Sequence, residues 1–502
     1  MQKLLDRYSD QIRGVLSCFD RVVLYATLQH LCYADGMASW LRRQGIRIFD
    51  FPKWAEPLRN KLRSNAEYIA KENNIQIEFV RKSGDRKDEL IQKVLEKRGG
   101  HPGLVHILSA MEGCGSYRPW HDKETGKTFL KGKWAKCLHY YFYFIDEVLG
   151  LCYVRVPTWA PFRLQVYYNG HNVLARQLGA AGIGYSMVDN AFVDIDDFEA
   201  AQALADDFDI KQLHSILNGY ARQCCPIADE LALSYRWSIM QVEHATDIVF
   251  KRREDLTPLY EVISETAVTA VKARNVATFL GRSLANYKGE VGNDFSTRIE
   301  GTRIKHQMGA ASIKMYDKRG IMIRVETTAN NVSFFKHHRK VDHRNGTTSY
   351  KVAPVRKTIY SLGDLTKLLR AANHRYLDFV ADLIDPAVGM KKLEKVVRPA
   401  TCKGRKYRGF NFFSPSDLDL FHAICAGEHM ISGFRNRDLR EQLSELSAGQ
   451  VSRLLKSLRL HGLIKRVGRT YKYYLTKLGK AAILTGLKVR RLVVIPELAI
   501  AD

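Results

Sequence analysis

The segment AGQVSRLLKSLRLHG at residues 448–462 is followed at once by LIKRVG at 463–468 and YKYYLT at 471–476. Ser447 stands before the first segment, where a helix cap is favoured, and Gly462 stands at its end, where helices commonly stop. Apolar residues recur in this segment at the spacing of one buried helical face: Val451, Leu454, Leu455 and Leu458. The other two segments predict the strands of a hairpin. The sequence therefore predicts a helix that runs directly into a β-hairpin.

Two further helices are predicted before this one. Ser414 and Pro415 form a helix start ahead of LDLFHAICAGE, and Gly433 leads into RDLREQLSEL. Residues 412–490 thereby resemble the winged helix-turn-helix domains of bacterial transcription factors, similar to the MarR type. The resemblance implies that the third helix enters the major groove of DNA and that the hairpin, the wing, touches phosphate or the minor groove. The candidate DNA contacts on the helix and the wing are Gln450, Ser452, Arg453, Lys456, Arg466, Arg469 and Lys472.

The alternative for this C-terminal module is a winged fold that contacts other proteins, in which the basic face of the helix is only exposed to solvent. The charge balance favours nucleic acid. Residues 301–502 contain 39 Lys and Arg against 16 Asp and Glu, whereas residues 1–300 contain 39 against 37. A surface this basic displaces counterions from a polyphosphate. We therefore expect DNA as the partner, with RNA as a second possibility for the middle region and a homodimer as a further option.

A three-stranded meander is predicted over residues 302–328, from TRIKH, SIKMYDK and GIMIRVETT. Strand alternation assigns one face to apolar residues: Ile304, Ile313, Met315, Ile321, Ile323 and Val325. The opposite face takes Tyr316, Glu326 and five cations that could contact a nucleic-acid backbone: Arg303, Lys305, Lys314, Lys318 and Arg324. The alternative is a solvated face on which these cations pair with Glu326 and Asp317.

The Tyr-Asp-Lys turn at 316–318, followed by Arg-Val-Glu at 324–326, is similar to a hairpin of some plasmid and phage rolling-circle replication initiators. The similarity covers under thirty residues. It suggests Tyr316 as a nucleophile and Glu326 as a base. Those initiators usually carry a His-hydrophobic-His metal motif, and none of the 16 histidines has that spacing. Metal-assisted nicking through such a motif is therefore not expected.

Carboxylates in the first three hundred residues offer another route to catalysis. A nuclease or strand-transfer enzyme needs two or three of them around Mg²⁺. The candidate ligands are Asp194, Asp196, Glu243 and Asp247, with Asp194 also a catalytic candidate. Asp194–Asp197 could equally cap the helix that follows. Whether the protein is an enzyme thus stays open, and Mg²⁺ is expected only if it is a nuclease.

The N-terminal region alternates apolar runs with segments predicted as helices, at residues 37–45, 53–74 and 87–99. Residues 19–28, 46–51, 75–80 and 104–110 are predicted as strands, and a hairpin rich in aromatic residues is predicted over 137–159. Such aromatics stack on bases in some proteins but belong to the core in most. Residues 163–300, including SYRWSIMQVEHATDIVF at 234–250, are expected to be mostly helical.

The sequence therefore predicts a multidomain α/β plus α+β protein. Its expected parts are an α/β domain with an aromatic hairpin (1–160), a mostly helical region (161–300), a basic meander with helices (301–397), a basic linker (398–411) and the winged helix (412–502). Nine scattered cysteines without a C-x-x-C pair argue against a zinc ribbon or a disulfide framework. No Walker A or dinucleotide motif occurs, and no apolar run approaches the length of a membrane span.

Two functions remain open from the sequence alone. In the first, the protein belongs to a mobile or replicating element and acts on DNA, using the winged helix to find its site. In the second, it is a transcriptional regulator whose large N-terminal region senses a ligand or dimerises. The size of that region and its extra basic sheet favour the first. Either way, the expected location is the cytoplasm, in association with the nucleoid.

Overall fold

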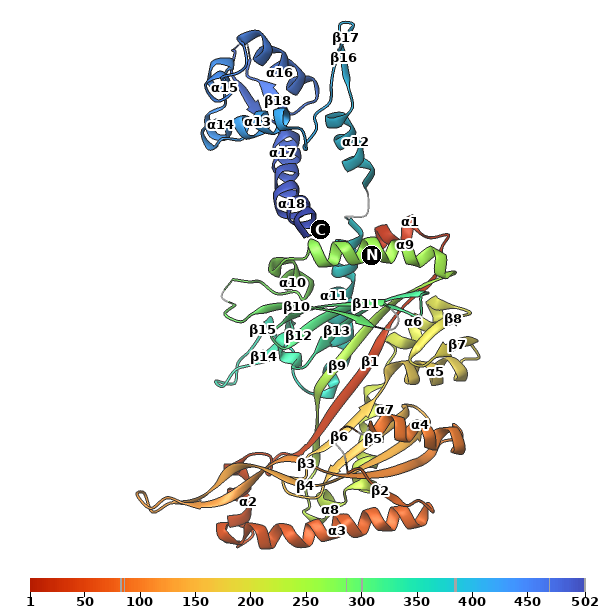
Figure 1. Cartoon of the computed structure of the whole chain (residues 1–502). Helices are drawn as coiled ribbons and strands as arrows, with labels where there is room; N and C mark the ends of the chain where they lie inside the picture. The colour runs from red at the N-terminus through yellow and green to blue at the C-terminus, as the bar shows by residue number, and fades with distance from the viewer. Residues whose placement is uncertain are drawn as a thin grey trace. The chain divides into compact units, whose positions relative to one another are not determined.

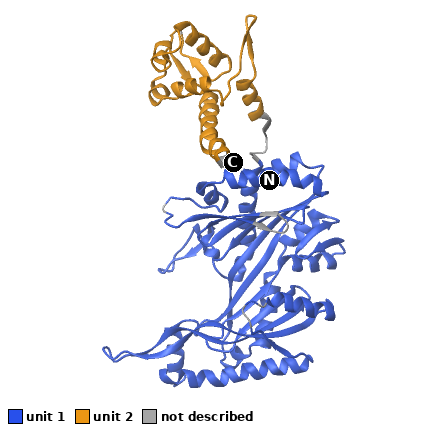
Figure 2. Ribbon diagram, in the orientation of Figure 1, with its two compact units in different colours: residues 1–382 blue, residues 383–502 orange. Residues whose placement is uncertain are grey.

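The computed structural model describes the chain to residue 500 with the exception of residues 82, 83, 85, 286, 299, 300, 383–385 and 469. These residues form two compact units, 1–382 and 383–502, drawn in different colours in Figure 2. Each unit has a hydrophobic core of its own. The described residues are mixed α/β with a large central sheet, which confirms the predicted fold class at this level.

An eleven-stranded sheet organises the first unit (Figure 1), in the order β10-β11-β12-β13-β9-β1-β6-β5-β4-β3-β2. β2 and β3 pair in parallel, and the other neighbouring strands among the described residues pair antiparallel. The strands are β1 (Ile12–Leu28), β2 (Ile77–Phe79), β3 (Gly103–His121), β4 (Thr128–Asp146), β5 (Gly150–Pro157), β6 (Leu164–Tyr168), β9 (Tyr235–Phe250), β10 (Val291–Arg298), β11 (Gly301–Met308), β12 (Ala311–Lys318) and β13 (Met322–Ala329).

Helices and two small hairpins surround this sheet. The helix α11 packs against β9 and β13, α5 packs against β1, and α4 packs against β3. The helices are α1 (Gln2–Arg7), α2 (Ala34–Arg43), α3 (Phe51–Glu72), α4 (Lys87–Arg98), α5 (Gly170–Ala180), α6 (Phe198–Asp206), α7 (Ile210–Cys224), α8 (Ile227–Glu230), α9 (Arg253–Thr269), α10 (Ala273–Phe279) and α11 (Leu362–Asp382). The hairpins are β7 (Tyr185–Val188) with β8 (Ala191–Ile195), and β14 (Lys336–Asp342) with β15 (Thr348–Pro354).

The prediction of a helix over residues 234–250 is wrong, because this segment forms strand β9. β9 pairs with β1 on one side and with β13 on the other. Both of its faces are covered, and every residue from His244 to Phe250 is buried. Burial on both faces removes the period-two alternation by which a half-buried strand is recognised. The pairing partners lie more than 70 residues away in sequence, so local pattern could not indicate them.

The strand predicted over residues 46–51 is also wrong. Ile48–Asp50 form a turn of 3₁₀-helix, and Phe51 begins α3. Pro52 follows in the first turn of α3, where its fixed φ suits a helix and its missing N–H costs nothing. The helices predicted near α2, α3 and α4 and the hairpin of β4 with β5 are confirmed.

The boundaries expected at residues 160 and 300 fall inside the first unit. β1 pairs with β6 and β9, and β9 pairs with β13. Strands from three expected segments therefore share one sheet and one unit. The predicted meander is confirmed as β11, β12 and β13, with Ile304 opposite Met315 and Met315 opposite Val325 on its apolar face.

The second unit consists of short helices with two small hairpins. Its elements are α12 (Pro386–Val397), β16 (Ala400–Cys402), β17 (Arg405–Tyr407), α13 (Pro415–Ile424), α14 (Gly427–Ser432), α15 (Asn436–Gln442), α16 (Ala448–Leu460), β18 (Ile464–Arg466), β19 (Tyr473–Leu475), α17 (Lys477–Val489) and α18 (Ile495–Ile500). The linker expected at 398–411 is instead part of this unit and contains the hairpin of β16 with β17. Thr401, for example, lies opposite Lys406 in this hairpin. The run of basic residues in this segment predicts a linker and gives no sign of paired strands.

Local sequence determines α16 as expected. Ser447 accepts a hydrogen bond from the backbone of Gln450, whose side chain accepts one from the backbone of Ser447. This reciprocal cap satisfies two amide groups that the helix start leaves free. Val451, Leu455 and Leu458 are buried in the core of the unit, and Leu454 packs against it. None of the described helices is long and apolar enough to cross a membrane.

Candidate functional site

Three carboxylates meet on three adjacent strands of the first unit. Asp20 on β1, Glu243 on β9 and Glu326 on β13 each bring one oxygen to a common position, and these oxygens lie within 4.8 Å of one another. We call these three residues the acidic cluster. Asp20 sits at an irregularity in the β1–β9 pairing between Phe19 and Arg21, a bulge that re-aims a side chain. Thr328 lies opposite Glu243, and Glu326, two residues before Thr328 on β13, therefore lies on the same face.

Glu243 and Asp247 lie on one face of β9. In a strand, residues four apart point to the same side, as the period of two requires. Asp247 does not join the acidic cluster directly but pairs with Arg324. Arg324 Nε and Nη2 donate to the two oxygens of Asp247, each at 2.6 Å. This bidentate geometry is the strongest arrangement for an arginine and a carboxylate.

Arg324, predicted to contact a nucleic-acid backbone from a basic sheet face, lies in the interior instead. It is 0% exposed, and Glu326 is 2% exposed. Its Nη1 atom lies 3.6 Å from Asp20 Oδ1 and 3.9 Å from Glu326 Oε1. That Nη1 makes no hydrogen bond within the described residues, although it is buried. A buried donor without an acceptor is costly, so this N–H is suited to an oxygen brought by a ligand.

Lys314 and Lys318 contribute positive charge near the carboxylates of this site. Lys314 Nζ lies 3.0 Å from Glu326 Oε2 and 3.5 Å from Glu243 Oε1. Burial disfavours its charge, yet Glu326 and Glu243 raise the pKa of Lys314 above its usual value. Lys318 donates to Asn190. Burial and the charge of Arg324 lower the pKa of Lys318 to about 8.

The side chains that surround Asp20 come from α5, from the cap residue before it and from the turn between β7 and β8. His171 Nδ1 lies 3.2 Å from Asp20 Oδ1, and Asn190 donates to that oxygen at 2.5 Å. Asn169 donates to it at 3.3 Å. Burial favours the neutral acid, but the hydrogen bond and charge of His171 and the charge of Arg324 hold the pKa of Asp20 well below its usual range.

Tyr316 points at the same group of residues. Its hydroxyl donates to Glu326 Oε1 at 2.6 Å. Burial and the charge of Glu326 raise the pKa of Tyr316 far above the usual value of 10.0. The two residues suggested by the Tyr-Asp-Lys and Arg-Val-Glu motifs are therefore in direct contact.

The other predicted residues of the first unit lie apart from the acidic cluster. Asp194 is on β8 and pairs with Arg13, and Asp196 is exposed. Arg303 pairs with Asp294 at 2.9 Å, and Lys305 lies opposite Lys314 on the neighbouring strand. Sequence reasoning missed Asp20, His171, Asn169 and Asn190. An acid inside the apolar run FDRVVLYATL at 19–28 was the one available clue to Asp20.

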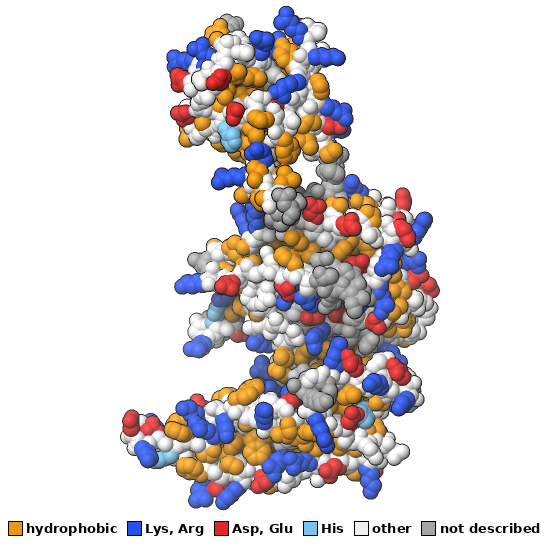
Figure 3. All heavy atoms as spheres, viewed as in Figure 1, with side chains coloured by type: hydrophobic (Ala, Val, Ile, Leu, Met, Phe, Trp, Pro, Cys, Tyr) orange, Lys and Arg blue, Asp and Glu red, His pale blue; other side chains and the backbone are white. Residues whose placement is uncertain are grey.

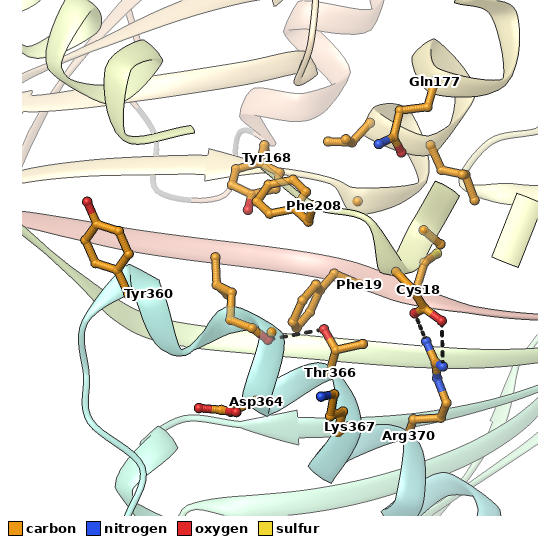
Figure 4. A pocket seen from close by; sticks show the side chains of 17 residues that line it. Cys18, Phe19, Tyr168, Gln177, Phe208, Tyr360, Asp364, Thr366, Lys367 and Arg370 are labelled. Carbon is orange, nitrogen blue, oxygen red and sulfur yellow. Dashed lines mark hydrogen bonds and ion pairs between the residues drawn. The ribbon is translucent and has the colours of Figure 1, made fainter. Parts of the chain in front are cut away.

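A separate cavity of about 430 Å³ lies beside β1 and α11 (Figure 4). The rings of Tyr168 and Phe208 stack with centroids 6.5 Å apart, and Thr366 and Lys367 of α11 lie on the other side. Arg370 pairs with Asp206 at its edge. None of its described lining residues belongs to the acidic cluster.

In the second unit, α16 and the hairpin of β18 with β19 present the residues predicted to contact DNA. Gln450, Arg453 and Arg466 are exposed; Lys and Arg side chains are visible on the surface of this unit in Figure 3. Ser452 is exposed and accepts from Asn436 at 2.9 Å. The ammonium groups of two half-buried lysines lie over aromatic rings: Lys456 over Tyr407 at 5.2 Å and Lys472 over Tyr474 at 5.9 Å. Arg469 lies outside the described residues.

Phe434 extends the hairpin. It forms an isolated bridge with Tyr473, with backbone hydrogen bonds of 3.0 and 2.8 Å in the two directions. The hairpin is thereby tied to the segment that precedes α15.

Comparison of the chain with family models, with curated proteins and with solved structures found no match.

Proposed function

We propose that this protein is a divalent-metal-dependent enzyme of a mobile or replicating element, which cleaves or transfers phosphodiester bonds of DNA. The observation that carries the proposal is the acidic cluster, in which Asp20, Glu243 and Glu326 converge from three adjacent strands. Carboxylate oxygens are the ligands that Mg²⁺ prefers. The buried Arg324 Nη1, which lacks a hydrogen bond among the described residues, is a second feature suited to an incoming oxygen.

The donor set fits a divalent cation. Three carboxylates offer hard oxygen ligands, and Lys314 and Arg324 now supply the positive charge near them. A bound Mg²⁺ would polarise a phosphate oxygen and stabilise charge in the transition state. Asn169, Asn190 and His171 orient Asp20 through contacts of 3.3, 2.5 and 3.2 Å.

Tyr316 is the candidate nucleophile for a covalent route. Its phenolic proton passes to Glu326, its oxygen bonds to phosphorus, and the bond from phosphorus to the next sugar oxygen breaks, that oxygen taking a proton from water. Burial and the charge of Glu326 raise the pKa of Tyr316, and this opposes the step. A divalent cation bound at the carboxylates would add positive charge, lower the pKa of Tyr316 and so favour this step. The same cluster without Tyr316 would serve a hydrolytic route.

The second unit is proposed as a winged helix-turn-helix similar to the MarR type, which docks on duplex DNA. The support is the order of α13, α15 and α16 before the hairpin, together with the bridge from Phe434 to Tyr473. The proposed contacts are Gln450, Ser452, Arg453, Lys456, Arg466, Arg469 and Lys472. Arg453 and Arg466 carry exposed guanidinium groups, which suit bidentate contact with guanine or phosphate.

The test is to incubate the full chain with Mg²⁺ or Mn²⁺ and with supercoiled or single-stranded DNA. We expect nicking or strand cleavage that requires the metal and is lost in Glu326→Gln and Asp20→Asn. Tyr316→Phe separates the two routes. If cleavage proceeds through the tyrosine, the wild-type chain forms a protein–DNA adduct that survives denaturation, and this adduct is absent in Tyr316→Phe.

The matched control is Glu72→Gln, which removes an exposed acid at the end of α3 and should leave cleavage unchanged. Each variant is compared with the wild type by circular dichroism, so that loss of fold is recognised. A well-folded wild-type chain that leaves every DNA form intact with both metals contradicts the proposed enzyme.

The alternative function is a transcriptional regulator whose large N-terminal region senses a ligand. The cavity of about 430 Å³ in Figure 4 favours it, because its size and aromatic lining suit a small molecule. This function predicts that the protein binds a defined operator sequence and cleaves no DNA. Its test is selection of bound fragments from genomic DNA, followed by footprinting. Binding scattered without a common sequence contradicts a regulator.

A further inference from the structure

A cavity of about 920 Å³ lies between α4 and the sheet. One wall consists of tyrosines on β4, β5 and β6, and α4 contributes residues including Lys87 and Ile91. Tyr143 lies opposite Tyr153, and Tyr153 lies opposite Tyr167, in consecutive antiparallel pairs. The three rings therefore form a row across three strands.

The row of rings is continuous. Centroids are 5.3 Å apart between Tyr143 and Tyr153 and 5.1 Å apart between Tyr153 and Tyr167, the second pair stacked at 17°. Tyr153 and Tyr167 are only half-buried, so part of each ring remains available beside the cavity. Tyrosine rings that line a basic cavity in this way offer apolar contact to unpaired bases whatever their sequence.

Cations accompany the rings. The guanidinium of Arg21 lies 5.5 Å from the centroid of Tyr167, and Arg21 and Arg86 are exposed. Asp88 and Asp189 also line the cavity, and Arg319 pairs with Asp189. The lining thus combines aromatic faces with accessible guanidinium groups. That combination suits a nucleotide, whose base is planar and whose phosphate is anionic.

The cavity adjoins two of the residues that hold Asp20 in the acidic cluster. Asn169 and Asn190 both line it, and both donate to Asp20. Arg21 follows Asp20 directly in β1. A strand whose phosphate lay at the carboxylates would therefore have its neighbouring bases beside Tyr153 and Tyr167.

We propose that this cavity binds unpaired nucleotides of a single strand next to the phosphate that the acidic cluster handles. The proposal rests on the proposed function, since it names the form of nucleic acid that the same site accepts. The exposed parts of the half-buried Tyr153 and Tyr167 rings contact the bases, and Arg21, which lies over Tyr167 in the unbound chain, contacts the adjoining phosphate. The substrate at the site is then single-stranded or locally melted, while the second unit holds duplex.

The experiment measures binding of a short oligothymidylate that carries one 2-aminopurine, a base whose fluorescence is quenched when it stacks. The full chain is used in EDTA, so that no cleavage occurs, with excess unlabelled duplex to saturate the second unit. We expect quenching with the wild type and an affinity about 10-fold lower in Tyr153→Leu and in Tyr167→Leu. Tyr153→Phe, which keeps the ring, should bind like the wild type.

Tyr68→Leu is the matched control, because Tyr68 is exposed on α3 away from the cavity lining. If a tyrosine variant fails to fold, Arg21→Ala, which changes an exposed side chain, should still lower the affinity. Quenching and affinity unchanged in the folded variants overturn the proposal. A free nucleoside monophosphate that binds as tightly as the oligonucleotide also overturns it, because the site would then hold a small molecule.

Failure here is distinguishable from failure of the proposed function. If the oligonucleotide stacks in the cavity but no DNA is cleaved with metal, the enzyme proposal fails and the single-strand site stands. If metal-dependent cleavage persists while Tyr153→Leu changes neither stacking nor KM for a single-stranded substrate, the cavity proposal fails alone.

Discussion

The same residue type has opposite surroundings in the two units. Arg324 of the first unit is fully buried and holds Asp247 by two hydrogen bonds of 2.6 Å. Arg453 and Arg466 of the second unit are exposed on α16 and at the end of β18. The difference teaches that net positive charge alone does not mark a nucleic-acid contact. A buried arginine positions and compensates carboxylates and can reach only a group that enters the interior, whereas an exposed one is open to phosphate at the surface.

The largest expected effect comes from removing the buried guanidinium. In Arg324→Met, Asp247 stays buried without its partner, and a broken buried ion pair typically costs about 3 to 5 kcal/mol. We expect the free energy of unfolding to fall by that amount, measured by chemical denaturation of the full chain. Arg453→Met makes the same chemical change at an exposed position and should cost no more than about 0.5 kcal/mol. Equal losses in the two variants would remove the contrast between the units.

A smaller effect is expected on DNA binding. Arg453→Ala and Arg466→Ala should weaken duplex binding by about 1 to 3 kcal/mol where the arginine touches a base. Where the arginine touches a phosphate instead, the slope of log affinity against log salt concentration should become shallower by about 1 in each variant. The measurement is a titration of labelled duplex at several salt concentrations, with folding stability unchanged.

Lys480→Ala provides the control for these variants. Lys480 is an exposed cation on α17, outside α16 and the hairpin. It should leave both affinity and salt slope nearly unchanged. If Lys480→Ala weakens binding as much as Arg453→Ala, DNA is held by a diffuse basic surface and the proposed winged-helix docking is wrong.

Features formed by residues close in sequence were predicted, and features formed by distant residues were not, for a physical reason. The cap at Ser447 and the buried stripe of α16 lie within one helix, so the sequence predicted both. The predicted meander and the contact of Tyr316 with Glu326 also join residues close in sequence. The acidic cluster instead joins β1, β9 and β13, and Asp20 is more than 200 residues from Glu243. Pairing over that distance leaves no periodic trace, and burial of β9 on both faces made a strand resemble a helix.

Glu112 provides an intermediate case and the smallest expected effect. Its carboxylate is about one quarter exposed and accepts from Lys87 at 2.9 Å and from Arg155 at 2.7 Å. Burial opposes its charge, but Lys87, Tyr141 and Arg155 lower the pKa of Glu112 from 4.5 to about 2. Because the folded pKa is depressed, the ionised group stabilises the fold above pH 4.5, and this stabilisation is lost as the pH falls toward 2.

Glu112→Gln should therefore lower the free energy of unfolding at pH 7 by about 1 to 2 kcal/mol, allowing for solvent screening. The difference from the wild type should shrink between pH 4.5 and 2, where the wild-type carboxylate becomes protonated as well. Denaturation series at several pH values measure it, with Glu72→Gln as the exposed control that shows no such trend. A difference that is constant with pH would mean that Glu112 acts through packing, since only an ion pair loses its contribution when the acid is neutralised.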